Sequence, residues 1–406
     1  MTITADQPPR PIAAAPHPRA ATGGVRIRDP RLDFYRGMAM FFIFIAHTPG
    51  NVFNSWIPAR FGFSDATEIF VFCSGMASAI AFGAVFDRAG WRLGTVRVGH
   101  RVWQIYWAHL GLFLACATFL AALDQTGAFD TVYIGTLNLW KFFQDDPGPL
   151  LVGLMTLTYV PNYFDILPMY LAILLMLPIV MALARLHPAA AGGFVVVLWL
   201  LAQSQLWSWG GLGLPAEPWS DRRWFFNPFA WQLIFFTGFA LMRGWLPTPP
   251  VRTWLVLVAA AIVVAFALMS DVAIREAGQT WARDWRGDNP LWVSKSNFGI
   301  LRYLHFLALA YLAWVIAGPG GRALNGPDLP VAWRRFVAVV TKVGQQSLAV
   351  FLFSMFWARV TGFGLDQVGR DFGTVALANA IGFALMIALA YGVGWIKGQP
   401  WKAPRP

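Results

Sequence analysis

Long apolar runs separated by short polar segments recur along the whole chain. Each run is about 20 residues long, which is enough to cross ~30 Å of hydrocarbon as a helix. A further apolar piece at 149–161 is too short to span and is expected to be re-entrant or interfacial. The pattern predicts ten spanning helices, at roughly 35–53, 66–86, 102–123, 165–185, 192–209, 226–243, 252–270, 299–317, 337–357 and 374–396.

Composition agrees with this pattern. The chain has 406 residues, of which 57% are hydrophobic and 13% are charged, whereas a soluble domain carries about 25% charged residues. The 21 Trp and 9 Tyr are suited to anchoring at membrane interfaces. The sequence therefore predicts an all-α, polytopic membrane protein with a central polar cavity. We expect a transmembrane domain at 29–400 after a disordered cytoplasmic tail at 1–28, which is rich in Pro, Ala and Arg.

The distribution of charge predicts an orientation. With the N-terminus inside, the inner segments hold 20 of the 31 Lys and Arg but only 5 of the 20 Asp and Glu. The positive-inside rule thus favours both termini in the cytoplasm. The net charge of +11 does not indicate nucleic-acid binding, because no basic cluster falls on a soluble module. No Cys/His spacing indicates a metal site, and Cys73 and Cys116 both lie in predicted membrane helices.

Two ionisable residues occupy the first predicted span. Arg36 and His47 are eleven positions apart, so they share one helical face and lie about 16 Å apart along the axis. Ionisable groups inside membrane helices usually mark a site or a pathway. The alternative is an Arg that reaches the inner surface and a His that is hydrogen-bonded in the core.

The Arg36–His47 spacing suits coenzyme A, which has an anionic nucleotide end and a thin pantetheine arm. Guanidinium groups on the cytoplasmic side can bind its phosphates. The arm would then present an acyl thioester near the imidazole of His47. A neutral His could act as general base on an acceptor hydroxyl that arrives from the outer side.

Longer motifs carry a family resemblance. Arg followed by ten residues and His resembles the first helix of the acyltransferase-three superfamily of integral membrane O-acyltransferases, and "EIFVFCSGMASA" at 68–79 resembles its second helix. The sequence is more specifically similar to the OpgC family, which is associated with succinylation of osmoregulated periplasmic glucans. Four runs in order carry this similarity: "RLDFYRGMAMFFIFIAHTPGNVF", "FDILPMYLAILLMLP", "NPFAWQLIFFTGF" and "LRYLHFLALAYL".

The resemblance implies an inner-membrane enzyme of bacteria that transfers an acyl group, expected to be succinyl, from a cytoplasmic acyl-CoA to a periplasmic glucan. His47 matches the catalytic His and Arg36 the Arg of the first-helix motif. The superfamily also places an Arg-x-x-Arg pair at the start of the third helix. Here Arg101 matches the second Arg, whereas Arg97 stands one residue before the first position, which Val98 occupies.

Other polar residues are weaker candidates. Glu68, one turn after Asp65, is expected either to orient His47 or to begin a helix. Asp165 would bind sugar hydroxyls or cap a helix. Arg302, which shares a helix face with His305, would contact the succinyl carboxylate, or would lie at the membrane interface.

Other functions remain open at this stage. A transporter or flippase would use Arg36 and His47 for protons or anions without covalent chemistry, although we find no internal repeat of the kind many transporters show. An O-acetyltransferase acting on another cell-envelope polysaccharide would use the same chemistry. A homo-oligomer is also possible.

Overall fold

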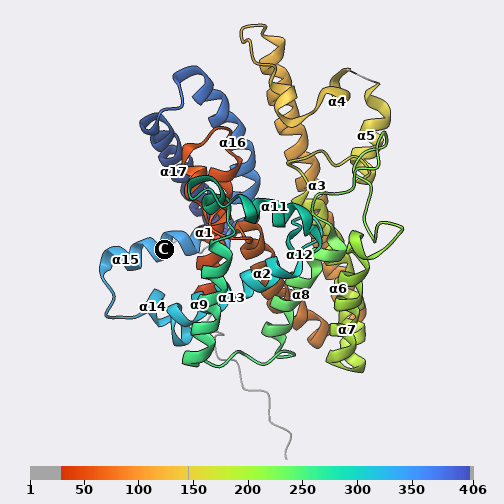
Figure 1. The fold of residues 1–406 in the computed structure, drawn as a ribbon, viewed down its shortest axis with the longest axis vertical. Coiled ribbons are helices and arrows are strands. Elements are labelled where there is room, and N and C mark those ends of the chain that lie inside the picture. Colours follow the sequence, from red (N-terminus) through yellow and green to blue (C-terminus); the bar gives the residue numbers. More distant parts are fainter. Residues whose placement is uncertain (1–28, 145, 403–406) are drawn as a thin grey trace, which may run out of the picture.

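A computed structural model describes residues 29–144 and 146–402, so the predicted tail at 1–28 lies outside the described residues. The described chain is all-helical and contains no strand, apart from one isolated bridge between Pro215 and Arg223. α3 runs through the full height of the view, with α16 and α17 beside its upper part (Figure 1). The long helices are α1 (Pro30–His47), α2 (Ala66–Ser78), α3 (Ala84–Gln125), α6 (Ile166–Leu186), α7 (Pro188–Leu201), α8 (Pro228–Arg243), α9 (Thr253–Ala267), α13 (Ile300–Ala317), α15 (Val331–Gln345), α16 (Ser347–Val368) and α17 (Phe372–Lys397).

Short helices lie between the long ones. A π-helical turn at Ala79–Gly83 joins α2 directly to α3. The loop after α3 contains α4 and α5, and the loop after α9 contains α10, α11 and α12; α14 precedes α15. Their bounds are Trp140–Gln144, Pro147–Thr156, Asp271–Glu276, Thr280–Asp288, Pro290–Val293 and Arg322–Asn325.

Five of the described helical segments are long and apolar enough to cross a membrane. They are the continuous stretch Ala66–Gln125 together with α6, α13, α16 and the stretch Phe372–Lys402. The apolar helices α5, α7 and α9 are shorter. The predicted piece at 149–161 is the ten-residue helix α5 within a loop.

Two predicted spans have wrong boundaries. The span at 337–357 does not exist as one helix, because the chain turns at Gln346 between the amphipathic α15 and the apolar α16. The sequence around the turn, "TKVGQQS" at 341–347, is mostly polar and contains Gly344, so a local signal for the break was present. The span at 192–209 ends early, because α7 stops at Leu201.

The ends of the helices form two groups. Arg243 at the end of α8 pairs with Asp87 near the start of α3 at 2.7 Å, and Arg31 in α1 donates to the carbonyl of Gly318 after α13. In the second group, the hydroxyl of Tyr133 donates to Asp366 at the end of α16. These contacts join segments that the charge pattern assigns to the same side.

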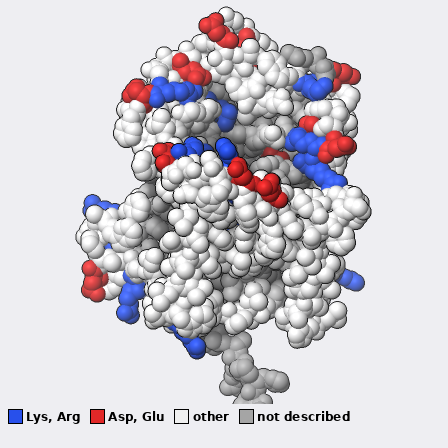
Figure 2. Space-filling view, in the orientation of Figure 1, with Lys and Arg blue, Asp and Glu red and all other residues white. Residues whose placement is uncertain are grey.

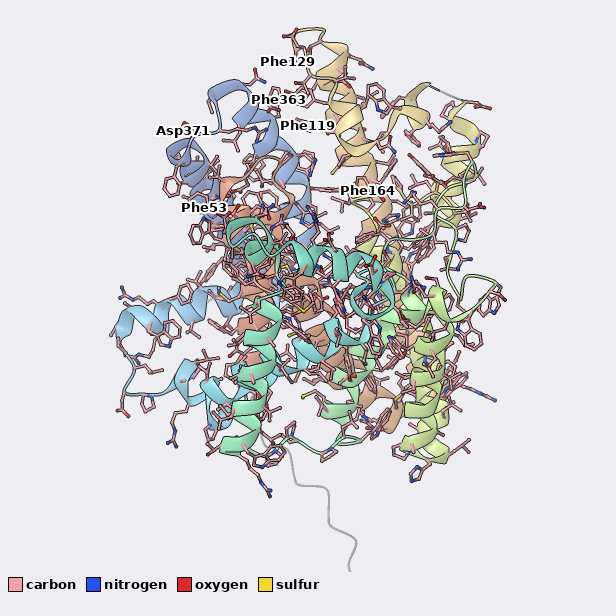
Figure 3. All side chains as sticks on the ribbon, in the orientation of Figure 1. Phe53, Phe119, Phe129, Phe164, Phe363 and Asp371 are labelled. Carbon is pink, nitrogen blue, oxygen red and sulfur yellow. The ribbon has the colours of Figure 1, made fainter. Side chains whose placement is uncertain are left out.

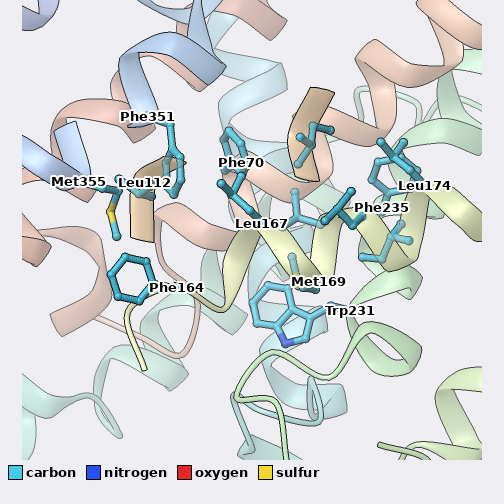
Figure 4. Packing of buried hydrophobic residues seen from close by; sticks show 14 of the residues in the cluster. Phe70, Leu112, Phe164, Leu167, Met169, Leu174, Trp231, Phe235, Phe351 and Met355 are labelled. Atoms are coloured by element: carbon cyan, nitrogen blue, oxygen red, sulfur yellow. The ribbon is translucent and has the colours of Figure 1, made fainter. Parts of the chain in front are cut away.

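Aromatic and aliphatic side chains fill the interior. In the core, Trp231 and Phe235 of α8 lie beside Met169 and Leu174 of α6 (Figure 4). Further up, Phe363 of α16 packs against Phe129, with ring centroids 5.1 Å apart, and against Phe119 of α3 (Figure 3). This packing continues from α1 to α17 as one large core.

Glycines allow two helix pairs to touch backbone to backbone. A Cβ at Gly37 in α1 would overlap the carbonyl oxygen of Val340 in α15, and one at Gly344 would overlap that of Asp33. Gly75 in α2 and Gly238 in α8 meet the partner backbone in the same way. Small residues commonly mediate such close helix packing in membranes. The pairs α1–α15 and α2–α8 are therefore tightly packed.

Candidate functional site

A cavity of about 280 Å³ opens at the C-terminal end of α1. It lies between α1, α2, the start of α6 and α16, and the loops around residues 162, 225 and 295 close it. Its lining contains both polar and aromatic side chains, as a site for a sugar and an acyl group requires. The lining residues are Ile43, His47, Thr67, Phe70, Asn162, Tyr163, Asp165, Ile166, Phe225, Phe226, Lys295, Phe351 and Met355.

His47 is the last residue of α1, and its imidazole lines this cavity. Its Nδ1 lies 2.8 Å from the carbonyl oxygen of Ile43, one turn earlier. Because a carbonyl oxygen only accepts hydrogen bonds, Nδ1 carries the proton, and in the neutral ring Nε2 is the basic nitrogen. No hydrogen bond to Nε2 is found from the described residues. The helix itself thus sets the tautomer that a general base requires.

Tyr163 and Arg359 support the imidazole. The Tyr163 ring lies edge-on to His47 at a centroid distance of 5.3 Å, and its hydroxyl donates to the carbonyl of Met355 at 2.5 Å. Arg359 lies over the Tyr163 ring and donates to the carbonyl of His47 at 2.7 Å. Tyr163 has a φ of 90°, a left-handed conformation that strains a bulky residue. Such strain is concentrated at functional sites, but the sequence gives no sign of it.

Lys295 is the only Lys or Arg among the residues that line the cavity. Its ammonium lies 2.5 Å from the carboxylate of Asp65, the N-cap of α2. Burial alone would raise the pKa of Asp65, but the charges of Lys295 and Arg302 hold that pKa well below its usual range. Lys295 was not among the site residues expected from the sequence. The available signal was that it is a lysine in a loop whose other basic residues are arginines.

Asp165 also lines the cavity, as the residue before α6. It makes no side-chain capping bond; instead its Oδ1 accepts a hydrogen bond from the backbone N–H of Phe225 at 3.2 Å. Burial raises the pKa of Asp165 to about 6, and the bond from Phe225 opposes the rise. Asp165 is thus available to sugar hydroxyls, whereas the alternative role as a helix cap is not observed.

Arg36 lies deeper in the molecule than the cavity and does not line it. Its guanidinium is buried between α2 and α16, where it donates to the carbonyl of Cys73 at 3.3 Å and to the hydroxyl of Ser347 at 3.4 Å. Its Nε is buried without a partner among the described residues. Since His47 also lies between α2 and α16, the two side chains share the face that the spacing predicts.

An aromatic pair separates Arg36 from the cavity. Phe70 of α2 and Phe351 of α16 stack with centroids 5.8 Å apart, and both line the cavity (Figure 4). Phe70 stands one turn before Cys73, and Phe351 stands one turn after Ser347, so the stack lies between the Arg36 contacts and the cavity. The predicted polar passage is closed by these two rings.

Glu68 does not contact His47, contrary to one expectation. It is fully buried: Oε1 accepts from Arg302 at 2.6 Å, and Oε2 accepts from the backbone N–H of Asp65 in a capping box. Its second expected role, beginning a helix, is therefore observed. The carbonyl of Ile43, rather than a carboxylate, orients His47.

Arg302 and His305 are part of the scaffold rather than of the cavity lining. Arg302 is the buried partner of Glu68. His305 is also buried, and its Nδ1 is hydrogen-bonded to the backbone N–H and the hydroxyl of Ser64. Both residues therefore fix α13 to the start of α2. The structure does not place either residue in the lining of the His47 cavity. Arg302 Nε and His305 Nε2 are buried without a hydrogen-bond partner among the described residues.

Cations of α3 and α17 lie near one another. Arg97 and Arg101 are on α3; Arg101 donates to Gln104, and Arg97 lies near the ring of Phe82. Arg101 is close enough to Lys397 for their charges to interact. Lys397 in turn donates to Gln346 at 2.7 Å, next to Ser347 and therefore near Arg36.

Comparison with known proteins gives one match. The sequence profile of the family described as OpgC protein matches residues 28–398. No curated protein and no solved structure shows significant similarity to the chain.

Proposed function

Because the chain belongs to the OpgC family, we propose that it is an integral membrane O-acyltransferase that succinylates a glucan, with acyl-CoA as donor. Membership of this family indicates a glucan-modifying role of the acyltransferase type. The observation that carries the proposal is the geometry of His47, which faces a cavity with an unprotonated Nε2 and a fixed Nδ1–H.

In the proposed reaction, a sugar hydroxyl enters the cavity and Nε2 of His47 accepts its proton. The alkoxide oxygen attacks the thioester carbonyl, the C–O ester bond forms and the C–S bond breaks. The proton then passes from the imidazolium to the departing thiolate of coenzyme A. General-base catalysis of this kind contributes about 10²–10⁴ in rate.

On the acceptor side, Asp165 and Asn162 line the cavity and supply oxygen atoms that accept hydrogen bonds from sugar hydroxyls. Lys295 lies in the same cavity and would contact the free carboxylate of a succinyl group. An acetyl group has no such carboxylate, so Lys295 favours the succinyl donor. In this proposal Lys295, rather than Arg302, contacts the succinyl carboxylate.

On the donor side, Arg97 and Arg101 would bind the phosphates of coenzyme A, with Lys397 beside them. Arg36 stands between this group and the cavity, where its buried guanidinium would contact the pantetheine arm. The arm reaches His47 only when Phe70 and Phe351 separate. In this proposal the donor binds at the cytoplasmic side of the bacterial inner membrane, and the glucan binds at the periplasmic side.

The test uses purified protein in lipid nanodiscs with succinyl-CoA or acetyl-CoA and a glucan. Thiol release and mass spectrometry of the glucan report transfer. We expect the His47→Gln variant to lose at least about 100-fold in rate, whereas a His187→Gln variant, in which an exposed His before α7 is changed, retains the wild-type rate. Transfer by His47→Gln at the wild-type rate would refute the general-base role.

The donor identity has its own variant. Lys295→Met is expected to reduce transfer from succinyl-CoA more than transfer from acetyl-CoA, because only the succinyl group carries a carboxylate. Equal reductions with both donors would remove the argument for a succinyl group. No transfer from either donor by the folded wild-type protein would refute the proposed function itself.

A further inference from the structure

A second cavity, which the proposed reaction does not use, lies next to the His47 cavity. It has a volume of about 510 Å³, and four arginines line it: Arg60, Arg275, Arg283 and Arg286. Asp271 is the only acid in the lining. A band of charged side chains crosses this face of the molecule at the level of α11 and α12 (Figure 2). The cavity therefore carries a net charge of about +3.

Part of this positive charge is already neutralised. Asp271 accepts from Arg60 at 3.1 Å and from Arg286 at 2.9 Å, which fixes both side chains. These hydrogen bonds and charges lower the pKa of Asp271 although burial raises it, so the carboxylate is ionised at neutral pH. Asp271 thus holds two guanidinium groups in place but neutralises only one of the four positive charges, and within the described chain it forms no ion pair with Arg275 or Arg283.

Arg275 and Arg283 supply the excess charge. Arg275 uses only its Nε, which donates to the backbone carbonyl of Asp271 at 3.3 Å. The Nε of Arg283 donates to its neighbour Asp284, and both side chains are about two-thirds exposed. No hydrogen bond from the Nη groups of either arginine is found within the described residues. These groups can bind carboxylates in a bidentate manner.

The two cavities are neighbours along one loop. Val293 lines the arginine cavity and Lys295 lines the His47 cavity. Their Cα atoms are at most ~7 Å apart, because only Ser294 lies between them. A second segment also connects the two cavities. It begins at Arg60, which lines the arginine cavity, and leads to Asp65, the ion-pair partner of Lys295. The guanidinium of Arg286 lies over the ring of Phe63, within this segment.

We propose that the arginine cavity binds the carboxylates of glucan that has already been succinylated, and so holds partly modified glucan beside His47. The inference rests on the proposed function, since each succinyl transfer adds one carboxylate to the product. A neutral glucan gains nothing from this cavity, whereas a succinylated one is retained. The enzyme is therefore expected to add several succinyl groups to one glucan before releasing it.

The first test measures binding directly. An oligoglucan with a fluorescent label is prepared unmodified, chemically succinylated or phosphorylated. Its anisotropy is followed with the full-length protein in nanodiscs of zwitterionic lipid. We expect the succinylated form to bind more tightly than the unmodified form, and added salt to reduce the difference. Equal binding of these two forms, or binding of the phosphorylated form alone, would overturn the proposal.

The matched variants are Arg275→Gln/Arg283→Gln in the cavity and Arg334→Gln/Arg335→Gln on α15, which are exposed arginines on another element. Because exposed charge pairs contribute little each, we expect the cavity variant to reduce the preference for the succinylated form by about threefold to tenfold. The α15 variant should retain that preference. An unchanged preference in the cavity variant would refute the role of the arginines.

A second test separates this inference from the proposed function. With neutral glucan and succinyl-CoA, the cavity variant is expected to add the first succinyl group at the wild-type rate but to produce glucans with fewer groups each. Mass spectrometry gives this distribution. A wild-type distribution in the variant counts against the inference, whereas failure of all transfer by the wild-type protein counts against the function and leaves the binding test valid.

Discussion

The buried pair of Glu68 and Arg302 gives the sharpest test of the structural assignments. Glu68→Gln keeps the size of the side chain but removes its charge, which leaves the guanidinium of Arg302 buried without its nearest counter-charge. The pair is 2.6 Å apart, and the Glu68 side chain is fully buried. Breaking such a pair from one side costs about 3–5 kcal/mol. We expect the lower part of that range, because Asp65 still interacts with Arg302.

The assay is thermal unfolding of the purified protein, followed alongside acyl transfer. For a chain of 406 residues, a loss of about 3 kcal/mol corresponds to a fall of about 3–5 °C in unfolding temperature. The double variant Glu68→Gln/Arg302→Gln should recover much of this loss, since it removes both charges. At a temperature where Glu68→Gln is still folded, we expect its turnover to remain within severalfold of the wild type.

The opposite pattern would refute this reasoning. If Glu68→Gln unfolds at the wild-type temperature but loses transfer as His47→Gln does, then Glu68 acts in the chemistry and not in the scaffold. A double variant that is less stable than either single variant would also show that the two groups do not form a coupled pair.

Three further predictions concern the cavity itself. The pKa of Asp165 is about 6 in the folded protein against an ordinary 3.8, so its contribution to the free energy of unfolding is full below pH 4 and is lost as the pH rises through 6. This loss is about 3 kcal/mol. Unfolding measured from pH 4 to 8 should show the loss in the wild type but not in Asp165→Asn. Phe70→Ala should open the floor of the cavity and raise the hydrolysis of succinyl-CoA in the absence of glucan, measured as thiol release. Phe143→Ala, at an exposed site, should leave hydrolysis unchanged. Unchanged hydrolysis in Phe70→Ala would refute the role of Phe70 as a barrier. Tyr163→Phe removes the hydrogen bond to Met355 and should lower kcat by about fivefold, equivalent to ~1 kcal/mol. An unchanged kcat would show that the tyrosine ring alone positions His47.

The sequence predicts well what depends on helical period. The all-helical fold follows from apolar runs of spanning length, and the shared face of Arg36 and His47 follows from their spacing of eleven residues. The turn at Gln346 was missed, because the apolar stretches before and after it were joined into one span across the short polar segment "KVGQQS" at 342–347.

Side-chain partners were harder to predict. Glu68, Arg302 and His305 are polar residues near helix ends that the charge pattern assigns to the outer side, so their types and positions suggest a site. In the structure Glu68 pairs with Arg302, and His305 is hydrogen-bonded to Ser64, as buried polar groups usually are. Lys295 and Tyr163 were missed, because their roles depend on loops that bring distant segments together and on one strained backbone angle.

The glycine contacts of α1 with α15 and of α2 with α8 decide which parts of the molecule are free to respond to a donor. Gly37 and Gly344 leave no space for α1 to slide or rotate, and Gly75 does the same for α2. Two of the three walls around His47 therefore act as a rigid frame. Access for a thioester must then come from rotation of the Phe70 and Phe351 side chains or from displacement of α16. A larger residue at Gly37 would shift the imidazole itself and is expected to abolish turnover, although Gly37 does not line the cavity.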